Sequence, residues 1–140
     1  MIGTLILTHG GLARELLAAA REIAGELDQF EAVSLEWGDG PDEARVKLRA
    51  AIERVDSGDG VLILADTYGG TPCNVALSVL DPGRVEVVSG VNLPMVMRLA
   101  CQGNRKQTDP AAAARWLQAK GRDSIRVGSE MGSNGGGPCE

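Results

Sequence analysis

Aromatic residues and basic charge are both scarce in this sequence. Phe, Trp and Tyr make up 3% of the 140 residues, too few for the stacked aromatic platforms that bind single-stranded nucleic acid. Lys and Arg number 14 against 19 Asp and Glu, so the net charge is −5 and the basic face of a nucleic-acid-binding domain is missing. We therefore expect no nucleic-acid partner, and a core built from Leu, Val, Ile and Ala.

Long hydrophobic runs are absent as well, and cysteine is rare. The sequence has no run of about 18 apolar residues, which excludes a membrane-spanning helix, and its start lacks the features of a secretory signal. The three cysteines are odd in number and form no Cys-x-x-Cys pair, so we expect neither a disulfide framework nor a zinc site. Cys73 and Cys101 are expected to fill helix faces and Cys139 to be a free thiol. This cysteine usage favours a cytoplasmic protein.

The chain alternates short apolar runs with segments of helical periodicity. Candidate strands are residues 5–7, 30–37, 61–65, 85–88 and 125–127. Candidate helices are residues 12–27, 41–55, 72–80, 94–101 and 111–120, the last capped by Asp109 and stopped by Gly121. This alternation predicts an α/β fold: a doubly wound, flavodoxin-like, mostly parallel sheet with helices on both faces.

One domain accounts for most of the chain, whose length is typical of a single domain. We place this domain at residues 1–127. Residues 128–140 read GSEMGSNGGGPCE, are rich in Gly and Ser, and show no apolar periodicity. This composition predicts a disordered tail.

The sole histidine, His9, ends the first strand, and Asp66 follows the third. In a flavodoxin-like order these strands are neighbours at the point where ligands bind, at the carboxyl ends of the strands. Each is followed by a glycine pair, Gly10-Gly11 or Gly69-Gly70, and then by a helix. Glycine lets backbone N–H groups approach a ligand closely, and helix N-termini favour anions. The pattern therefore predicts an imidazole and a carboxylate facing each other beside a phosphate-sized site.

These residue types favour a histidine nucleophile. A carboxylate that holds one imidazole nitrogen fixes the tautomer and leaves the other nitrogen nucleophilic. One His and one Asp are too few ligands for a metal, so we expect no metal and no cofactor. His9 is then predicted to carry a phosphoryl group, with Asp66 orienting its ring. Simpler readings stay open: a lone histidine at a strand end is more often structural, and Asp66 and Thr71 fit capping roles, with Pro72 as the first helical residue.

Three segments carry a family resemblance: THG at residues 8–10, DTYGGTPCN at residues 66–74 and GVNLPM at residues 90–95. They resemble the IIA domain of the mannose/fructose/sorbose family of the bacterial phosphoenolpyruvate sugar phosphotransferase system, over nearly all of the chain outside the tail. The phosphotransfer subunit of dihydroxyacetone kinase shares the fold but differs in the second segment. The resemblance implies a phosphotransferase component whose His9 accepts phosphate at Nε2 from the phosphocarrier HPr and passes it to a IIB protein.

The same resemblance implies further roles. Asp66 would be the partner of His9 Nδ1, and the phosphoryl group would be held by Thr67, Gly70 and Thr71, beside the Gly10 backbone. Family members are homodimers in which a final strand, here residues 122–127, joins the partner's sheet. The membrane would be reached only indirectly, through a permease complex. Because the family's Ala/Pro-rich linker is not found here, we expect the IIB component to be a separate protein.

Two other functions remain open from the sequence. The same histidine would serve a regulatory phosphohistidine module that controls partner binding without sugar transport. A flavodoxin-like nucleotide-binding protein is a weaker candidate, because the GxxxxGKS and GxGxxG fingerprints are absent and aromatics that would hold a flavin are scarce. The transported sugar is not encoded in this chain.

Overall fold

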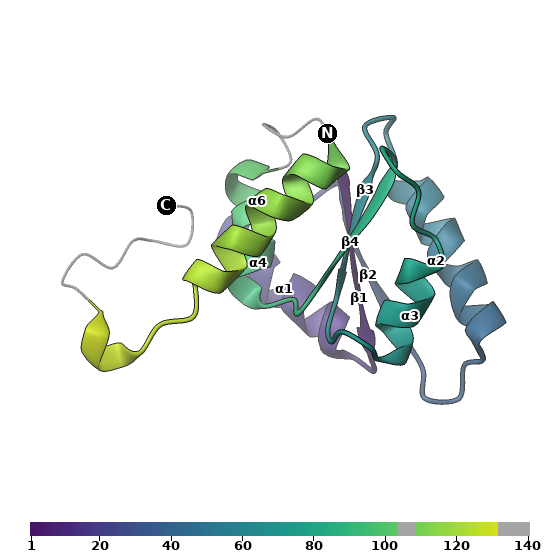
Figure 1. Ribbon diagram of the computed structural model, residues 1–140, viewed down its shortest axis with the longest axis horizontal. Helices are drawn as coiled ribbons and strands as arrows, with labels where there is room; N and C mark the ends of the chain where they lie inside the picture. The colour runs from purple at the N-terminus through teal and green to yellow at the C-terminus, as the bar shows by residue number, and fades with distance from the viewer. Residues whose placement is uncertain (104–108, 132–140) are drawn as a thin grey trace.

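Four parallel strands form the middle layer of the structure, a computed structural model that describes residues 1–103 and 109–131 (Figure 1). They are β1 (Gly3–His9), β2 (Phe30–Leu35), β3 (Val61–Ala65) and β4 (Val85–Ser89). Their order is β2-β1-β3-β4, so β1 and β3 are hydrogen-bonded neighbours although they are not consecutive in the chain. The predicted doubly wound, flavodoxin-like fold is confirmed, and the strand order reverses between β1 and β3.

Helices cover both faces of this sheet (Figure 1). One face carries α1 (Leu12–Ala24), α4 (Leu93–Arg98) and α6 (Pro110–Asp123), and the other carries α2 (Pro41–Val55) and α3 (Thr71–Leu77). The predicted helix at 94–101 is α4 followed by a π-helical turn, η1 (Leu99–Gly103), and a 3-10 turn, η2 (Gly128–Glu130), comes after α6. Within the two described ranges, no helix has both the length and the hydropathy to cross a bilayer.

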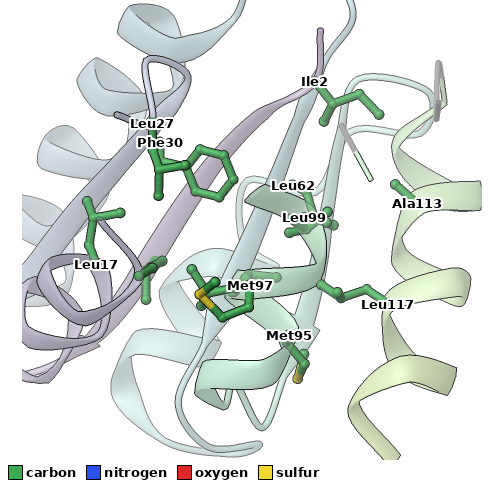
Figure 2. Close-up of a cluster of buried hydrophobic side chains, with 14 of the residues drawn as sticks. Ile2, Leu17, Leu27, Phe30, Leu62, Met95, Met97, Leu99, Ala113 and Leu117 are labelled. Carbon is green, nitrogen blue, oxygen red and sulfur yellow. The ribbon is translucent and has the colours of Figure 1, made fainter. Parts of the chain in front are cut away.

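The sheet separates two hydrophobic cores. Successive residues of a strand point to opposite faces, so Ile6 belongs to the core under α1, α4 and α6, whereas Leu5 and Leu7 belong to the core under α2 and α3. Figure 2 shows the first core, where Leu62 of β3 meets side chains of α4 and α6. All five residues of β3 are buried, and each large aliphatic side chain contributes about 1.5–3 kcal/mol. This strand is therefore a rigid base for the residue that follows it.

The last helix is longer than its sequence pattern predicts. We expected it to stop at Gly121, but α6 continues to Asp123. Gly121 is buried inside the helix, and a Cβ added there would lie 2.8 Å from Sδ of Met95 in α4. This glycine allows close packing between two helices rather than ending one. The predicted cap is confirmed: Asp109 accepts a backbone N–H two residues further on, at 3.2 Å.

Residues 125–127, predicted as a last strand, form no strand within the described chain. A strand requires a hydrogen-bonded neighbour, and this segment instead leads away from the sheet toward η2 (Figure 1). Ile125 and Val127 are 79% and 60% exposed. The predicted tail begins with η2, and its residues 132–140, which include Cys139, lie outside the described residues.

Two local predictions are corrected. Gly70, not Thr71, is the N-cap of α3, and Thr71 is the first helical residue with no capping hydrogen bond from a side chain. Cys101 is disulfide-bonded, so the expectation that no cysteine would pair is wrong. Cys73 is a buried free thiol, as expected.

Candidate functional site

His9 and Asp66 lie together at the carboxyl edge of the sheet. His9 is the last residue of β1, and Asp66 directly follows β3. Leu7 and Ala65 are the last pair between β1 and β3, so His9 and Asp66 both lie just beyond this pairing, at the same edge of the sheet. His9 Nδ1 lies 2.7 Å from Asp66 Oδ2, and the same oxygen accepts the His9 backbone N–H at 3.0 Å. One carboxylate therefore fixes both the ring and the backbone of His9.

Asp66 is an ionised hydrogen-bond acceptor in this arrangement. Burial raises the pKa of its carboxyl, but hydrogen bonds from the His9 backbone, the His9 ring and the Thr67 backbone outweigh burial and hold the pKa below its usual value. An ionised carboxylate only accepts hydrogen bonds. In the neutral ring of His9 the proton therefore lies on Nδ1, and Nε2 keeps its lone pair.

The His9 ring is accessible to solvent, whereas the Asp66 carboxylate behind it is largely buried. The His9 side chain is 32% exposed and that of Asp66 is 10% exposed. A partly open ring backed by a buried carboxylate suits a group that meets a reactant delivered from outside.

Gly70 packs against the edge of the His9 ring. A Cβ added at Gly70 would lie 3.1 Å from Cε1 and 3.7 Å from Nε2 of His9, and 2.8 Å from Oγ1 of Thr67. Any side chain at this position would displace the ring or the Thr67 hydroxyl. Asn74 donates to the Gly69 carbonyl in a long contact of 3.5 Å, which links the loop to α3. The absence of a side chain at Gly70 thus leaves room for the imidazole.

The start of α1 is anchored beside His9 by Thr8, the first residue of the THG segment. Thr8 is fully buried, and its Oγ1 accepts the backbone N–H of Ala13 at 2.7 Å. Gly10 has φ +54°, a left-handed conformation that glycine adopts without strain. Its N–H donates to the Leu35 carbonyl at 3.1 Å, so this N–H already has an acceptor in β2. The sequence did not predict this anchoring role, because a β-branched residue fits any strand.

Four of the predicted site residues lie in one cluster, and Thr71 lies beside it in the chain. His9, Asp66, Thr67 and Gly70 form one cluster through the contacts above. Thr71 comes next in the chain, as the exposed first residue of α3. The predictions that β1 and β3 are adjacent and that the imidazole faces the carboxylate are confirmed by the geometry.

Trp37 contacts the site through its ring. We expected a strand over residues 30–37, but β2 ends at Leu35, and Trp37 lies beyond it and is 82% exposed. Its indole stacks on the His9 ring, with centroids 5.3 Å apart and planes 25° apart. Hydrophobic pattern alone cannot distinguish such a residue from a core aromatic. The signal lies in its position, two residues past the strand that flanks β1.

The third family segment has a structural role. Asn92 caps α4 by accepting the N–H of Met95 at 3.0 Å, and the Val91 N–H donates to the Ala65 carbonyl at 3.0 Å. These bonds hold the start of α4 beside the end of β3, next to Asp66. The segment therefore supports the site without supplying a reactive group.

A groove lies apart from His9, along the open edge of the sheet. It is lined by residues of β4 and α6: Glu86, Val87, Val88, Ser89, Ala111, Ala114, Arg115 and Gln118. In the part of the chain that the structure describes, no cluster of three or more His, Cys, Asp or Glu residues could hold a metal ion.

Comparison with known proteins gives a consistent result. Residues 3–114 match the family described as "PTS system fructose IIA component". The chain is 36% identical over 97 residues to the PTS system mannose-specific EIIAB component of Escherichia coli K12, an alignment that covers 69% of this chain and 30% of that protein. It is 32% identical over 100 residues to the PTS system fructose-specific EIIA component of Bacillus subtilis 168, which covers 71% of this chain and 68% of the relative. The chain thus spans less than a third of the E. coli protein.

Solved structures show the same fold. The mannose/sorbose-specific IIA subunit of the phosphotransferase system from Enterococcus faecalis superposes with a TM-score of 0.79 and 31% identity, covering 90% of this chain and 93% of that one. The phosphotransferase system component EIIA from Streptococcus agalactiae superposes with a TM-score of 0.84 over 94% of this chain and 100% of that one; its 23% identity supports the fold alone.

Proposed function

The chain belongs to the PTS system fructose IIA component family, and from this premise we propose that it is a phosphoryl carrier of sugar uptake. In this proposal His9 accepts a phosphoryl group from phospho-HPr and passes it to a IIB component. The supporting observation is the 2.7 Å contact between His9 Nδ1 and Asp66, because it leaves Nε2 as the free nucleophile of a partly exposed ring.

The proposed transfer requires little from the protein beyond positioning and charge stabilisation. The Nε2 lone pair attacks phosphorus, a new nitrogen–phosphorus bond forms, and the bond between phosphorus and the donor atom breaks with its electron pair remaining on the donor. The phosphorylated ring then carries a positive charge. The ionised carboxylate of Asp66 stabilises that charge through the Nδ1–H hydrogen bond. Transfer onward to IIB breaks the same bond and returns the electron pair to Nε2.

The phosphoryl group itself would rest against the loop that follows β3. Thr67 offers a hydroxyl close to the ring edge, and Gly70 and Thr71 stand where the first N–H groups of α3 lack intrahelical acceptors. The N–H of Gly10 is already bonded to the Leu35 carbonyl. Gly10 would therefore shape the site through its left-handed turn rather than through this N–H. Replacing Gly70 with Ala should therefore slow transfer by crowding the ring.

We also propose a homodimer in which residues 125–127 pair with the partner's sheet; the implied strand over 122–127 is shortened because α6 continues to Asp123. Support comes from three features: β4 has an open edge, a groove runs along it, and Ile125 and Val127 are exposed on a segment that leads away from its own sheet. An exposed apolar segment and an unpaired strand edge are complementary. The carrier would act in the cytoplasm and reach the membrane only through a permease complex.

Phosphorylation with purified components tests the carrier function. Incubation with phosphoenolpyruvate, Enzyme I and HPr should label the wild-type protein, and His9→Ala should remain unlabelled while folding normally. Addition of a IIB component should then remove the label. Label retained in His9→Ala would refute the assignment of His9, and label that enters but never leaves to any IIB component would favour the regulatory alternative.

A further inference from the structure

We propose that Trp37 is a positioning residue for His9, because its indole restrains the imidazole in the orientation that presents Nε2. The proposal rests on the proposed function in that Nε2 is taken as the phosphorylated atom. The stacking itself is a property of the unphosphorylated protein and can be measured independently.

The other contacts leave one motion of the ring unrestrained. Asp66 holds the ring at Nδ1, within the ring plane, and Gly70 approaches its edge at Cε1. A hydrogen bond and an edge contact do not prevent the ring from tilting out of that plane. Trp37 lies against a face of the ring, with centroids 5.3 Å apart and a small interplanar angle of 25°. A face contact opposes this tilt and completes the set of restraints.

Trp37 is presented by a turn that is fastened to α2. Asp39 accepts the Glu36 N–H at 3.1 Å, and its own N–H donates to the Glu36 carbonyl at 3.0 Å. Lys47 of α2 donates to the same Asp39 carboxylate at 2.7 Å. These bonds bracket Trp37 on both sides in the chain. An indole on a fastened turn restrains its neighbour better than one on a free loop.

The indole also passes close to Gly10, because a Cβ added there would lie in ordinary van der Waals contact with Trp37 Nε1, at 3.8 Å. Because Trp37 is largely exposed, it contributes little to the hydrophobic core. Because its indole stacks on the His9 ring, loss of the indole should affect the site far more than global stability.

Phosphorylation makes this contact more favourable. The ring gains positive charge when Nε2 is phosphorylated, and a cation near the face of an indole is attracted by the electrons of that face. Trp37 therefore stabilises the phosphorylated ring as well as orienting the free one. We expect Trp37→Ala to slow phosphorylation by HPr by about two- to tenfold, and Trp37→Phe to retain most of the rate.

Proton NMR of the unphosphorylated protein measures the stacking directly. His9 is the sole histidine, so its two ring-proton signals are unambiguous. Ring currents of the indole should shift them upfield in the wild type. The shift should disappear in Trp37→Ala, persist in part in Trp37→Phe, and be unchanged in Trp116→Phe. Ile23→Ala is the control for transfer, because Ile23 is 50% exposed in the last turn of α1, at the end of that helix remote from His9.

The outcomes separate this proposal from the carrier function. Ring-proton shifts that do not respond to Trp37→Ala would refute the stacking. A shift that does respond, with transfer rates equal in the wild type and Trp37→Ala, would refute the positioning role. A transfer loss that is equal in Ile23→Ala would also refute it, by indicating a general surface effect. A wild type that shows the shift but is never phosphorylated would overturn the carrier function and leave the stacking intact.

Discussion

A carboxylate decides which nitrogen of His9 is nucleophilic. Asp66 Oδ2 accepts from the ring at Nδ1 and from the backbone of the same residue, so tautomer and orientation are set together. In Asp66→Asn the charge is lost, and with it a charge-assisted hydrogen bond of about 1.5–3 kcal/mol. We expect phosphorylation to be about 10- to 100-fold slower in this variant. A labelling time course with quenched samples measures this rate. An unchanged rate in a normally folded Asp66→Asn variant would show that Asp66 takes no part in phosphorylation.

The lowered pKa of Asp66 predicts how stability depends on pH. Because the folded-state pKa lies below the usual value of about 4, the ionised carboxylate stabilises the fold above that pH, and this contribution is lost as the pH falls through the folded-state pKa. At about pH 7 the wild type should be more stable than Asp66→Asn by about 1–2 kcal/mol. Urea unfolding should show that this difference shrinks below about pH 4. A difference that is constant down to about pH 3 would contradict the assigned pKa direction.

Individual site residues were predictable only where their residue type or their position after an apolar run is distinctive. His9 is the sole histidine and Asp66 ends a fully apolar run, so each is distinctive in the sequence alone. Thr8 and Trp37 are not distinctive, because their roles depend on three-dimensional neighbours rather than on residue type. The occupied N–H of Gly10 was likewise unpredictable, since its acceptor comes from the other flanking strand.

At the scale of elements, a glycine in a helical pattern marks either the end of a helix or a close packing contact, and the sequence alone does not distinguish the two. Gly121 was predicted to end the last helix, yet it lies inside α6. A glycine is needed there because a side chain would collide with Met95. Helix termini with polar caps were easier to predict, and Asp109 caps α6 as expected. The end of β2 was misplaced because Trp37 continues the apolar pattern past Leu35. Caps are local signals, whereas packing clearances and strand ends depend on the neighbouring element.

Replacing Gly121 with Ala tests this packing. Alanine gains about 1 kcal/mol of helix propensity, but the added methyl overpacks the contact with Met95 at a cost of about 1–3 kcal/mol. We expect a net destabilisation of about 1 kcal/mol in thermal or urea unfolding. The double variant Gly121→Ala/Met95→Ala should lose less than the sum of its single variants. Strict additivity would show that the two residues do not share this contact.

At the scale of the whole molecule, the order of strands was predictable and the use of the C-terminal segment was not. Alternating elements and right-handed crossovers restrict the topology, and this restriction places β1 beside β3. No such rule fixes residues 125–127, whose apolar side chains are exposed in the single chain. Their partner, in the proposed dimer, belongs to another molecule.

The proposed dimer predicts an effect on size rather than on folding. Ile125→Asp combined with Val127→Asp should convert the protein to a monomer, because charged side chains oppose burial in the partner's groove. Val46→Asp is the matched control: Val46 is 69% exposed on α2, which covers the other face of the sheet. Light scattering after size-exclusion chromatography measures the mass. A wild type that is monomeric, or a double variant that stays dimeric, would contradict the swapped strand.

The position of the phosphoryl group on the imidazole tests the central claim most directly. Phosphorus and nitrogen NMR of the phosphorylated, nitrogen-15-labelled protein distinguishes attachment at Nε2 from attachment at Nδ1. Because Nδ1 donates to Asp66, we predict that the group is on His9 Nε2. Phosphorylation at Nδ1, or at any residue other than His9, would contradict the account.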